Sequence, residues 1–230
     1  MAVLLAGAFV QGVVGLGIGL LTAPVVSLLE PQLMPGYLLL LVVLMPVVTL
    51  RHERGGVHWR GLAWSLPMRV PGTAVGVWLV AVLADRWIGL AVGVMVLVAV
   101  VASSQTVAVP INRGTLGVAG FVSGVTGTAT SIGGPPIALL YQSWPAQRVR
   151  PTMAVYFLVG ATLSLVGLSV TGEITRAQVL LAAVSVPVLL LGDLLARRWR
   201  DRLAGPAFRS AVLVVCLVSA LALVLRSLLP

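Results

Sequence analysis

The stretch AFVQGVVG at residues 8–15 recurs in altered form as GFVSGVTG at residues 120–127, about half the chain later. The offset between the two copies is 112 at this point, then becomes 116 and stays constant, because the second copy has about four extra residues near 128–131. Pairs at the offset of 116 are Gly17/Gly133, Pro35/Pro151, Gly56/Gly172, Arg60/Arg176, Pro71/Pro187, Gly76/Gly192, Asp85/Asp201, Arg86/Arg202 and Gly89/Gly205. The chain is therefore a duplicated unit, with a first repeat at 1–110 and a second at 111–230. Duplicated apolar units are typical of secondary transporters, whose substrate site lies where the repeats meet.

The composition predicts an all-α polytopic membrane protein. The 230 residues are 59% hydrophobic and only 9% charged, with a mean hydropathy of +1.10, whereas a soluble domain has about 25% charged residues. A membrane span needs about 20 residues, and the apolar segments lie at 2–29, 35–50, 62–84, 87–108, 115–142, 152–170, 177–196 and 207–228. Little of the chain remains for a domain outside the bilayer, so we expect a multi-pass protein of a cell membrane of the bacterial inner-membrane type.

The charged residues point to lipid as the partner of this surface. The net charge of +9 comes from fifteen arginines, no lysine and six acidic residues. Almost all the arginines lie between apolar segments, where they set topology and contact lipid head groups, so nucleic-acid binding is not expected. The lack of lysine excludes a phosphate-binding loop of the Gly-x-x-x-x-Gly-Lys-Ser/Thr type, and hence ATP hydrolysis by this chain. A single cysteine, Cys216, excludes an intrachain disulfide.

The distribution of arginines distinguishes two topologies. If all eight segments cross the membrane, six loop arginines lie on one face and eight on the other. If instead the first segment of each repeat enters and leaves on one side, three remain on one face (Arg86, Arg176 and Arg226) and eleven gather on the other (Arg51, Arg54, Arg60, Arg113, Arg148, Arg150, Arg197, Arg198, Arg200, Arg202 and Arg209). The second distribution obeys the positive-inside rule and places both termini outside. It predicts two inverted repeats, each a Gly/Pro-broken re-entrant hairpin plus three transmembrane helices. Eight plain spans are the alternative.

The two expected hairpins, 2–29 and 115–142, are interrupted by glycine and proline near their middles. Such a break must be buried in protein or line a water-filled cavity, and it exposes backbone N–H groups and helix N-termini that favour an anion. Candidate substrate-binding residues are Gln11, Gly15, Gly17, Gly19, Arg69, Ser123, Thr126, Gly127, Thr128, Thr130, Ser131, Gly133 and Gly134. Gln11 and Ser123 are equivalent in the repeats and are expected to face each other. Close helix packing is the alternative role for the glycines, above all Gly12 and Gly124.

These motifs resemble the TauE/SafE sulfite exporter family over essentially the whole chain. The matching features are residues 120–127 with the later GGPP at 133–136, GLGIG at 15–19 with Pro24, and PGTAVG at 71–76. The resemblance implies membrane transport of sulfur-containing or related organic anions. Two departures fall at the hairpin tips, namely Ile18 within the first glycine run and TATS at 128–131. The substrate is therefore not fixed by the resemblance.

Two charged residues lie within apolar segments. Arg69, between Pro67 and Pro71, is either a counter-charge for an anion or a side chain that extends to the membrane interface. Asp193 precedes Arg197 by one helical turn, which favours a structural ion pair, and a proton-coupling carboxylate is the alternative.

We therefore expect a secondary transporter of small sulfur-containing or organic anions that exports its substrate by alternating access, with a proton as the candidate coupling ion. An anion channel or a non-transporting membrane subunit is the alternative. An intramembrane serine hydrolase or metalloprotease is disfavoured, because both histidines (His52 and His58) lie in a loop and no metal-ligand cluster exists. No cofactor or metal is expected. The small-residue faces are compatible with a homodimer.

Overall fold

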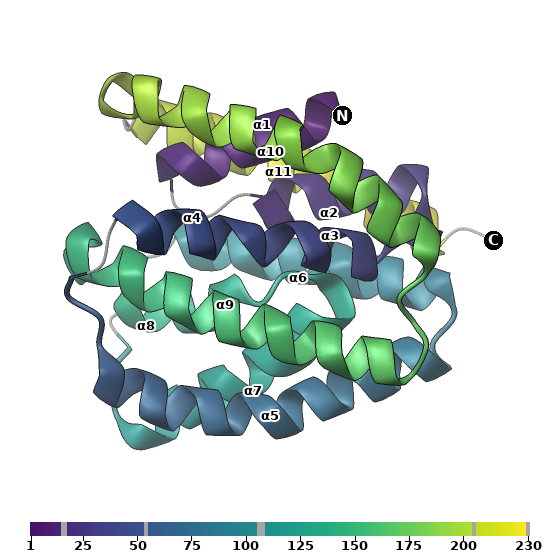
Figure 1. The fold of residues 1–230 in the computed structure, drawn as a ribbon, viewed down its shortest axis with the longest axis horizontal. Coiled ribbons are helices and arrows are strands. Elements are labelled where there is room, and N and C mark those ends of the chain that lie inside the picture. The colour runs from purple at the N-terminus through teal and green to yellow at the C-terminus, as the bar shows by residue number, and fades with distance from the viewer. Residues whose placement is uncertain (15–17, 53–54, 105–108, 204–205, 229–230) are drawn as a thin grey trace.

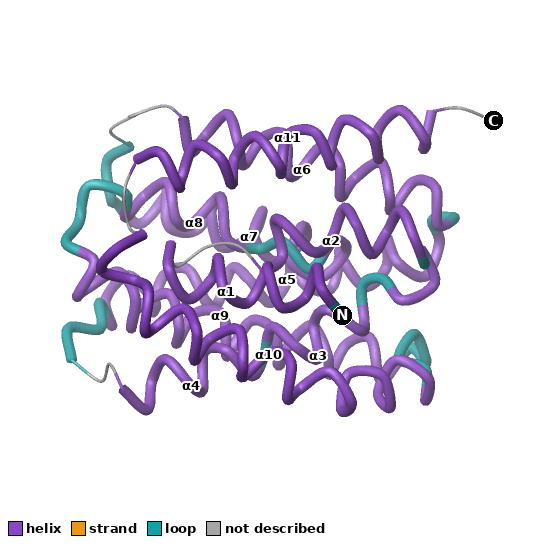
Figure 2. The backbone as a smooth tube through the Cα atoms, turned by 90° about the horizontal axis from the view of Figure 1, so that it is seen from above, coloured by secondary structure: helices purple, strands orange, loops and turns teal. Residues whose placement is uncertain are grey.

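A computed structural model describes residues 1–14, 18–52, 55–104, 109–203 and 206–228, and these residues form helices joined by short loops. The helices run side by side along the long axis of the molecule, with loops gathered at its two ends (Figures 1 and 2). In chain order they are α1 (Ala2–Val14), α2 (Ile18–Leu29), the 3-10 helix η1 (Pro31–Leu33), α3 (Gly36–Val42), α4 (Leu44–His52), α5 (Trp59–Val82), α6 (Asp85–Ser104), α7 (Arg113–Thr130), α8 (Gly134–Tyr141), α9 (Ala146–Val170), α10 (Arg176–Leu203) and α11 (Pro206–Leu228).

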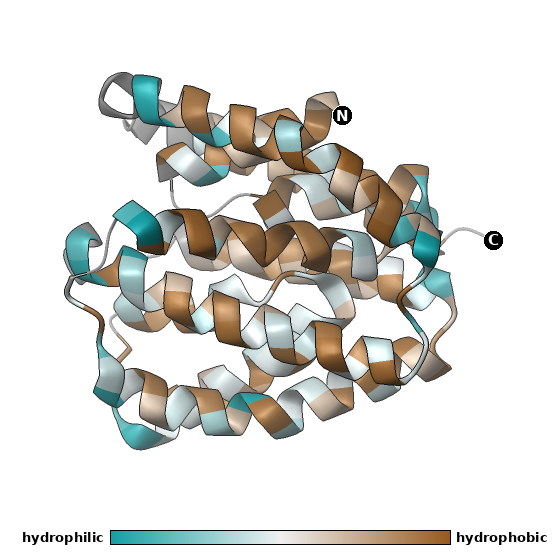
Figure 3. Cartoon of the chain, in the orientation of Figure 1, coloured by the Kyte–Doolittle hydropathy of each residue, from teal (hydrophilic) through white to brown (hydrophobic). Residues whose placement is uncertain are grey.

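The helices confirm the prediction of an all-helical membrane protein. In the described part of the chain, five helices are long and apolar enough to cross a membrane: Trp59–Val82, Asp85–Ala102, Gln147–Val170, Arg176–Trp199 and Ser210–Leu228. Shorter apolar helices lie at Ala2–Val13, Ile18–Leu29 and Gly36–His52. Hydrophilic residues concentrate at the two loop-bearing ends and hydrophobic residues fill the length between them (Figure 3). This is the distribution that a bilayer requires of a multi-pass protein.

The helix boundaries differ from the predicted apolar segments at three places. The segment predicted at 35–50 is divided into α3 and α4, because Pro46 has no N–H to donate to the carbonyl one turn earlier. Helix α9 begins at Ala146, before the arginines that precede its apolar run, and α10 continues through the arginine-rich stretch to Leu203. Hydropathy marks only the part of a helix that meets lipid, whereas the backbone hydrogen bonds of these two helices continue past it.

Two helix pairs are broken and folded back where glycine and proline are concentrated. In the first pair, α2 returns along α1, so that a Cβ placed on Gly7 would lie 3.5 Å from the Cα of Ile18. In the second, α8 returns along α7, and a Cβ on Gly127 would lie 3.1 Å from the Cα of Gly133. We call these pairs hairpin 1 and hairpin 2.

Each hairpin packs its first helix in parallel against a long helix from the other half of the chain. In hairpin 1, Ala8 lies beside Gly192 of α10, and a Cβ placed on Gly192 would lie 2.7 Å from the Cβ of Ala8. One turn further along both helices, Gly12 lies against Ala196. In hairpin 2, Gly120 and Gly124 of α7 contact α5 in the same order as the chain runs, at Ser65 and then at Arg69 and Thr73. The α1–α10 and α5–α7 contacts are among the most extensive in the fold.

The two ends of the bundle differ in charge. At one end, α4 and α10 finish and α5 and α9 begin: His58 N–H donates to Thr152 Oγ1 at 2.9 Å, and His52 lies 2.8 Å from Arg197. We call it the basic end, since it holds Arg51, Arg60, Arg113, Arg148, Arg150, Arg197 and Arg198. At the opposite end, α10 begins beside η1, where Gln178 Nε2 donates to the Gln32 carbonyl at 2.9 Å. Hairpin 1 starts and finishes toward the opposite end, and hairpin 2 toward the basic end.

Candidate functional site

Helices α5 and α7 approach each other backbone to backbone. A Cβ on Gly124 would lie 2.6 Å from the Arg69 carbonyl oxygen and 2.8 Å from the Thr73 nitrogen, and a Cβ on Gly72 or Gly120 would collide with the other helix. Only glycine allows this approach. The prediction that Gly12 and Gly124 serve helix packing is confirmed, and the same packing brings the α5 backbone at Arg69 against hairpin 2.

Arg69 is buried in the middle of the bundle, with 2% of its surface exposed. Its Nη1 donates to Ser123 Oγ at 3.0 Å, and its guanidinium carbon lies 4.6 Å from the centre of the Tyr156 ring on α9. Gly160, one turn beyond Tyr156, leaves room for the guanidinium, because a Cβ there would collide with the guanidinium carbon and Nε. The guanidinium therefore does not extend to a membrane interface. This excludes the interface-seeking role of Arg69 and leaves that of a counter-charge for an anion.

The charge of Arg69 is not balanced by a carboxylate in the described part of the chain. Its described contacts are a hydroxyl, an aromatic ring and the glycines Gly127 and Gly160, and its Nε has no hydrogen-bond partner there. A buried charge without a partner is costly. A negatively charged ligand would remove that cost.

A cavity with about 60 Å³ open to the centres of water molecules lies beside this guanidinium. It is lined by Gln11, Ile18, Gly19, Leu20, Leu39, Val42, Arg69, Gly127, Ser131, Ile132, Gly133, Gly134, Pro135, Phe157 and Ala161. The first residues of α2 and α8 are among them, so both returning helices direct their N-termini at the cavity. The positive ends of two helix dipoles and one guanidinium thus meet in one small space, which favours an anion.

The tips of the two hairpins contact each other at the cavity wall. A Cβ on Gly19 would lie 3.1 Å from the Ser131 carbonyl oxygen. Ser131 has a left-handed backbone with φ of 62°, and its hydroxyl donates to the Pro35 carbonyl at 2.9 Å. The second tip is thereby attached to the start of α3, and this break is covered by protein as the membrane interior demands.

Gln11 and Ser123 occupy equivalent positions, and each bonds across the break of its own hairpin. Gln11 Oε1 accepts the N–H of Ile18 at 3.2 Å, and the Ser123 hydroxyl donates to the Gly133 carbonyl. The expectation that these two side chains face each other is not met, because each is used to hold its own two half-helices together.

The structure brings seven of the predicted site residues together around the cavity: Gln11, Gly19, Arg69, Gly127, Ser131, Gly133 and Gly134. Four others use their hydroxyls within the protein and do not line it. Thr126 and Thr130 donate to carbonyls one turn back in α7, Thr128 bonds Ser164 at 2.8 Å, and Ser123 bonds Arg69 and Gly133. Gly15 and Gly17 lie outside the described residues.

The sequence did not predict that α3 and α9 line the cavity. Leu39 and Val42 come from α3, and Phe157 and Ala161 from α9. Tyr156 was missed as well, although it is fully buried against the guanidinium. The only available signal was a tyrosine in the middle of an apolar segment, which does not indicate by itself which way the ring points.

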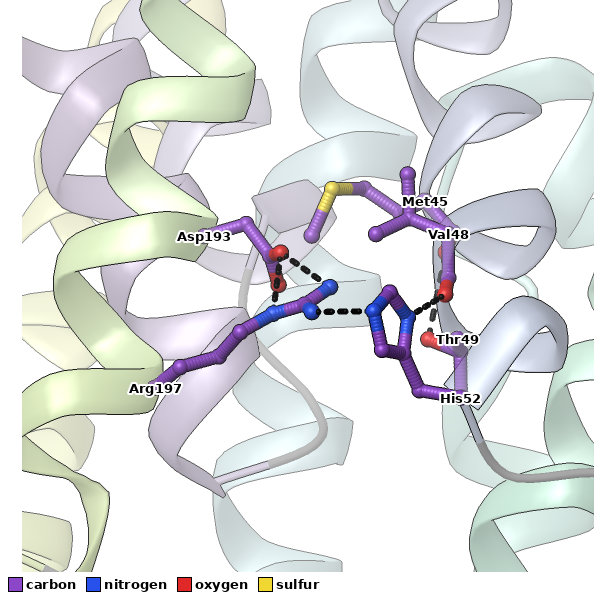
Figure 4. Close-up of polar contacts among 6 residues, drawn as sticks. All are labelled: Met45, Val48, Thr49, His52, Asp193 and Arg197. Atoms are coloured by element: carbon purple, nitrogen blue, oxygen red, sulfur yellow. Dashed lines mark hydrogen bonds and ion pairs between the residues drawn. The ribbon is translucent and has the colours of Figure 1, made fainter.

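Asp193 forms the structural ion pair that its spacing predicted. Its Oδ2 lies 2.7 Å from Arg197 Nη2 and accepts from Nε at 2.8 Å. Arg197 Nη1 also lies 2.8 Å from His52 Nε2, while His52 Nδ1 lies 2.9 Å from the Val48 carbonyl (Figure 4). The network joins α10 to α4 at the basic end. Among the described residues, no group of three or more His, Cys, Asp or Glu could hold a metal ion.

Comparison with known proteins gives matches over most of the chain. The family model described as "Sulfite exporter TauE/SafE" matches residues 1–223. A protein of Comamonas testosteroni named "Probable inner membrane transporter protein TsaS" is 26% identical over 173 residues, which are 73% of this chain and 72% of that protein. A protein of Cupriavidus necator named "Probable sulfite/organosulfonate exporter TauE" is 25% identical over 209 residues, 86% of this chain and 82% of its own length. No solved structure matches.

Proposed function

Since the chain belongs to the TauE/SafE sulfite exporter family, whose members are membrane transporters and not enzymes, we propose that it is a secondary transporter of small sulfur-containing or organic anions. Its substrate site is the cavity between the two hairpin tips. The direction is export, as the names of the family and of the Cupriavidus necator relative suggest.

The observation that carries this proposal is the buried guanidinium of Arg69, which no described carboxylate neutralises, beside a cavity that receives two helix N-termini. Each of these groups favours negative charge, and none of the residues around the cavity is a carboxylate. Among the lining residues that the sequence suggested, the side-chain amide of Gln11 and the backbone N–H groups of Gly133 and Gly134 at the start of α8 are the donors available to an oxyanion.

The site favours a compact monoanion. The desolvation cost of an ion rises with the square of its charge, and the only full positive charge at the described cavity is the Arg69 guanidinium, to which the two helix N-termini add partial charges. A cavity of about 60 Å³ has room for a few water molecules, which suits a three-oxygen head group on a small substituent. The apolar side chains of Leu20, Leu39, Val42 and Phe157 can accommodate such a substituent. We therefore expect small sulfonates and bisulfite to be preferred over sulfate.

The packing of the helices supports two inverted repeats, at 1–110 and 111–230. The first helix of each hairpin runs parallel to the corresponding long helix of the other repeat, α1 with α10 and α7 with α5, and α6 pairs with its counterpart α11. The hairpins start from opposite ends of the bundle, which agrees with re-entrant hairpins in repeats of opposite orientation. The basic end is then cytoplasmic, and both termini lie on the other side.

In this arrangement transport proceeds by alternating access: the two repeats move about the tips so that the cavity opens to one side and then to the other. When the substrate binds, contacts with the guanidinium and the helix N-termini replace its hydration shell. When the cavity opens to the other side, water takes the place of these contacts and the substrate leaves. A transmembrane proton gradient or the membrane potential is the proposed driving force.

Flux measurements in proteoliposomes test this function. We expect saturable uptake of sulfite or a short-chain sulfonate that other monoanions inhibit and sulfate inhibits weakly. Arg69→Gln should abolish uptake, whereas Arg69→Lys, which keeps the charge but not the ring stacking, should retain a fraction of it. Uptake that does not saturate would indicate the alternative, an anion channel. Full activity of the Arg69→Gln variant would remove the cavity as the substrate site.

A further inference from the structure

The two long helices that flank the site differ in how closely they pack against their neighbours. Helix α5 contacts α9 at both ends of the bundle: His58 N–H donates to Thr152 Oγ1 at 2.9 Å at the basic end, and at the opposite end a Cβ on Gly167 would lie 2.7 Å from Val77 Cγ2. Val77 belongs there to a buried apolar cluster that includes Leu168. The α5–α9 contact is therefore closed along its whole length.

Helix α10 makes the corresponding contact at one end only. At the opposite end it packs against α3, where Tyr37 Oη lies 2.9 Å from Ser185 Oγ, and Gln178 donates to the Gln32 carbonyl of η1. Toward the basic end α4 packs against α9 and not along α10. The connection between α10 and α4 is instead made by the long side chain of Arg197 reaching His52 (Figure 4). The two helices thus diverge toward the basic end.

The repeat offset of 116 makes these two contacts equivalent. Helix α5 corresponds to α10, and α9 corresponds to α3 and α4. Adding 116 to Val77 gives Asp193, and subtracting 116 from Gly167 gives Arg51. The contact that closes α5 onto α9 at the opposite end therefore corresponds to the position where Asp193 and Arg51 would meet if α10 closed onto α4.

We propose that Asp193 and Arg51 form an ion pair in the second conformation of the transporter, in which α10 closes onto α4 at the basic end while α5 separates from α9 at the opposite end. This inference rests on the proposed function, because alternating access between inverted repeats requires each repeat to adopt the conformation of the other. The conformation seen here, with α5 closed and α10 diverging, is then the one that opens toward the basic end.

The charged groups at this place are suited to an exchange of partners. Asp193 is paired with Arg197 of its own helix, and its Oδ1 lies 3.5 Å from where a Cβ on Gly12 would be. Arg51, exposed in the last turn of α4, has no ion pair with the described part of the chain. Closing the helices would transfer the carboxylate from one arginine to another, so the number of neutralised charges stays the same and neither conformation is strongly favoured.

Paired cysteines test the proposal in native membranes. In a Cys216→Ala background, which contains no other cysteine, three variants are oxidised with copper phenanthroline and analysed for disulfide-linked peptides by mass spectrometry. They are Arg51→Cys/Asp193→Cys for the proposed contact, Val77→Cys/Gly167→Cys for the equivalent contact seen here, and Leu50→Cys/Asp193→Cys as a control from a neighbouring face of α4. A disulfide needs Cα atoms within about 7 Å, so the reaction reports close approach.

We expect the first two variants to form disulfides and the Leu50 control to form at least tenfold less. A disulfide at Val77/Gly167 with none at Arg51/Asp193 would overturn the proposal, as would equal reaction of the Leu50 control. Failure of the Val77/Gly167 pair would overturn the contact on which the equivalence rests.

The flux of a transported anion gives the second readout. Either disulfide should stop transport, and reduction should restore it. Transport that continues with the Arg51/Asp193 disulfide formed would overturn the proposal. If the parent protein transports no anion at all, the proposed function fails, whereas the disulfide pattern still decides whether the two helices close in this way.

Discussion

The guanidinium carbon of Arg69 lies 4.6 Å from the centre of the Tyr156 ring, and the hydroxyl of that same tyrosine has no hydrogen-bond partner in the described structure. The ring face therefore stabilises the guanidinium, and the hydroxyl contributes nothing visible to the fold. A cation held over a buried ring gains about 2 kcal/mol or more. The pair combines a charge that needs an anion with a ring that holds the charge in position until the anion arrives.

Replacing Tyr156 should separate the role of the ring from the role of the hydroxyl. Tyr156→Leu removes the ring that holds the guanidinium beside the cavity and about 2 kcal/mol of cation–π stabilisation, part of which is lost from the folded protein itself, so we expect the anion to bind up to about 30-fold more weakly. Tyr156→Phe keeps the ring and should bind within about twofold of the parent protein, because loss of an unpartnered hydroxyl is nearly neutral. Anion-dependent thermal stabilisation in detergent measures both. Equal losses in the two variants would show that the hydroxyl, and not the ring, is what the site requires.

A methyl group at Gly160 should displace the guanidinium. The Cβ of Gly160→Ala would collide with the Arg69 guanidinium carbon, and overpacking of this kind costs about 1–3 kcal/mol. We expect transport to fall at least tenfold. The control is Gly117→Ala on α7, whose Cβ would meet only the flexible Met68 side chain at 3.4 Å. The control should transport normally, and an equal loss in both variants would indicate a general defect in helix packing.

A leucine at Gly133 should abolish transport and leave membrane insertion intact. Its Cβ would lie 3.0 Å from the Ser123 carbonyl oxygen and 3.1 Å from the Gly127 Cα, so the side chain must push α8 away from α7 or enter the cavity. Gly114→Leu, in the exposed first turn of the same hairpin, is the matched control. Flux and the amount of folded protein after extraction are measured together. Normal flux in Gly133→Leu would remove this tip from the transport site.

His58, at the start of α5, should make folding stability depend on pH. Burial, followed by the charges of Arg60 and Arg148, lowers the pKa of His58 below its usual 6.5. The folded protein thus binds the proton less readily than the unfolded chain, and the stability present above pH 6.5 is lost as pH falls through the lowered value. We expect the midpoint of thermal unfolding to drop between pH 7.5 and 5, and His58→Gln to flatten that part of the profile. An identical slope in the variant would assign the pH dependence to other groups.

The breaks in the two hairpins could be predicted from the sequence because glycine and proline act on the local backbone. The orientation of Arg69 could not, since it depends on the absence of side chains at Gly127 and Gly160, which belong to two other helices. The four hydroxyl residues that do not line the cavity are a different case. Thr126 and Thr130 bond carbonyls one turn back, which is the usual behaviour of threonine within a helix, so the sequence did contain a reason to expect them to turn away from a ligand.

The parallel packing of α1 against α10 has a consequence for biosynthesis. Gly12 contacts Ala196, so α1 packs against a helix that is synthesised much later in the same chain. At about 5–20 residues per second, roughly ten seconds or more separate the appearance of the two helices. During that time α1 lacks the long helix against which it is finally packed. We therefore expect hairpin 1 to complete its packing only after α10 has been translated, whereas hairpin 2 emerges after its partner α5 and can pack directly beside it.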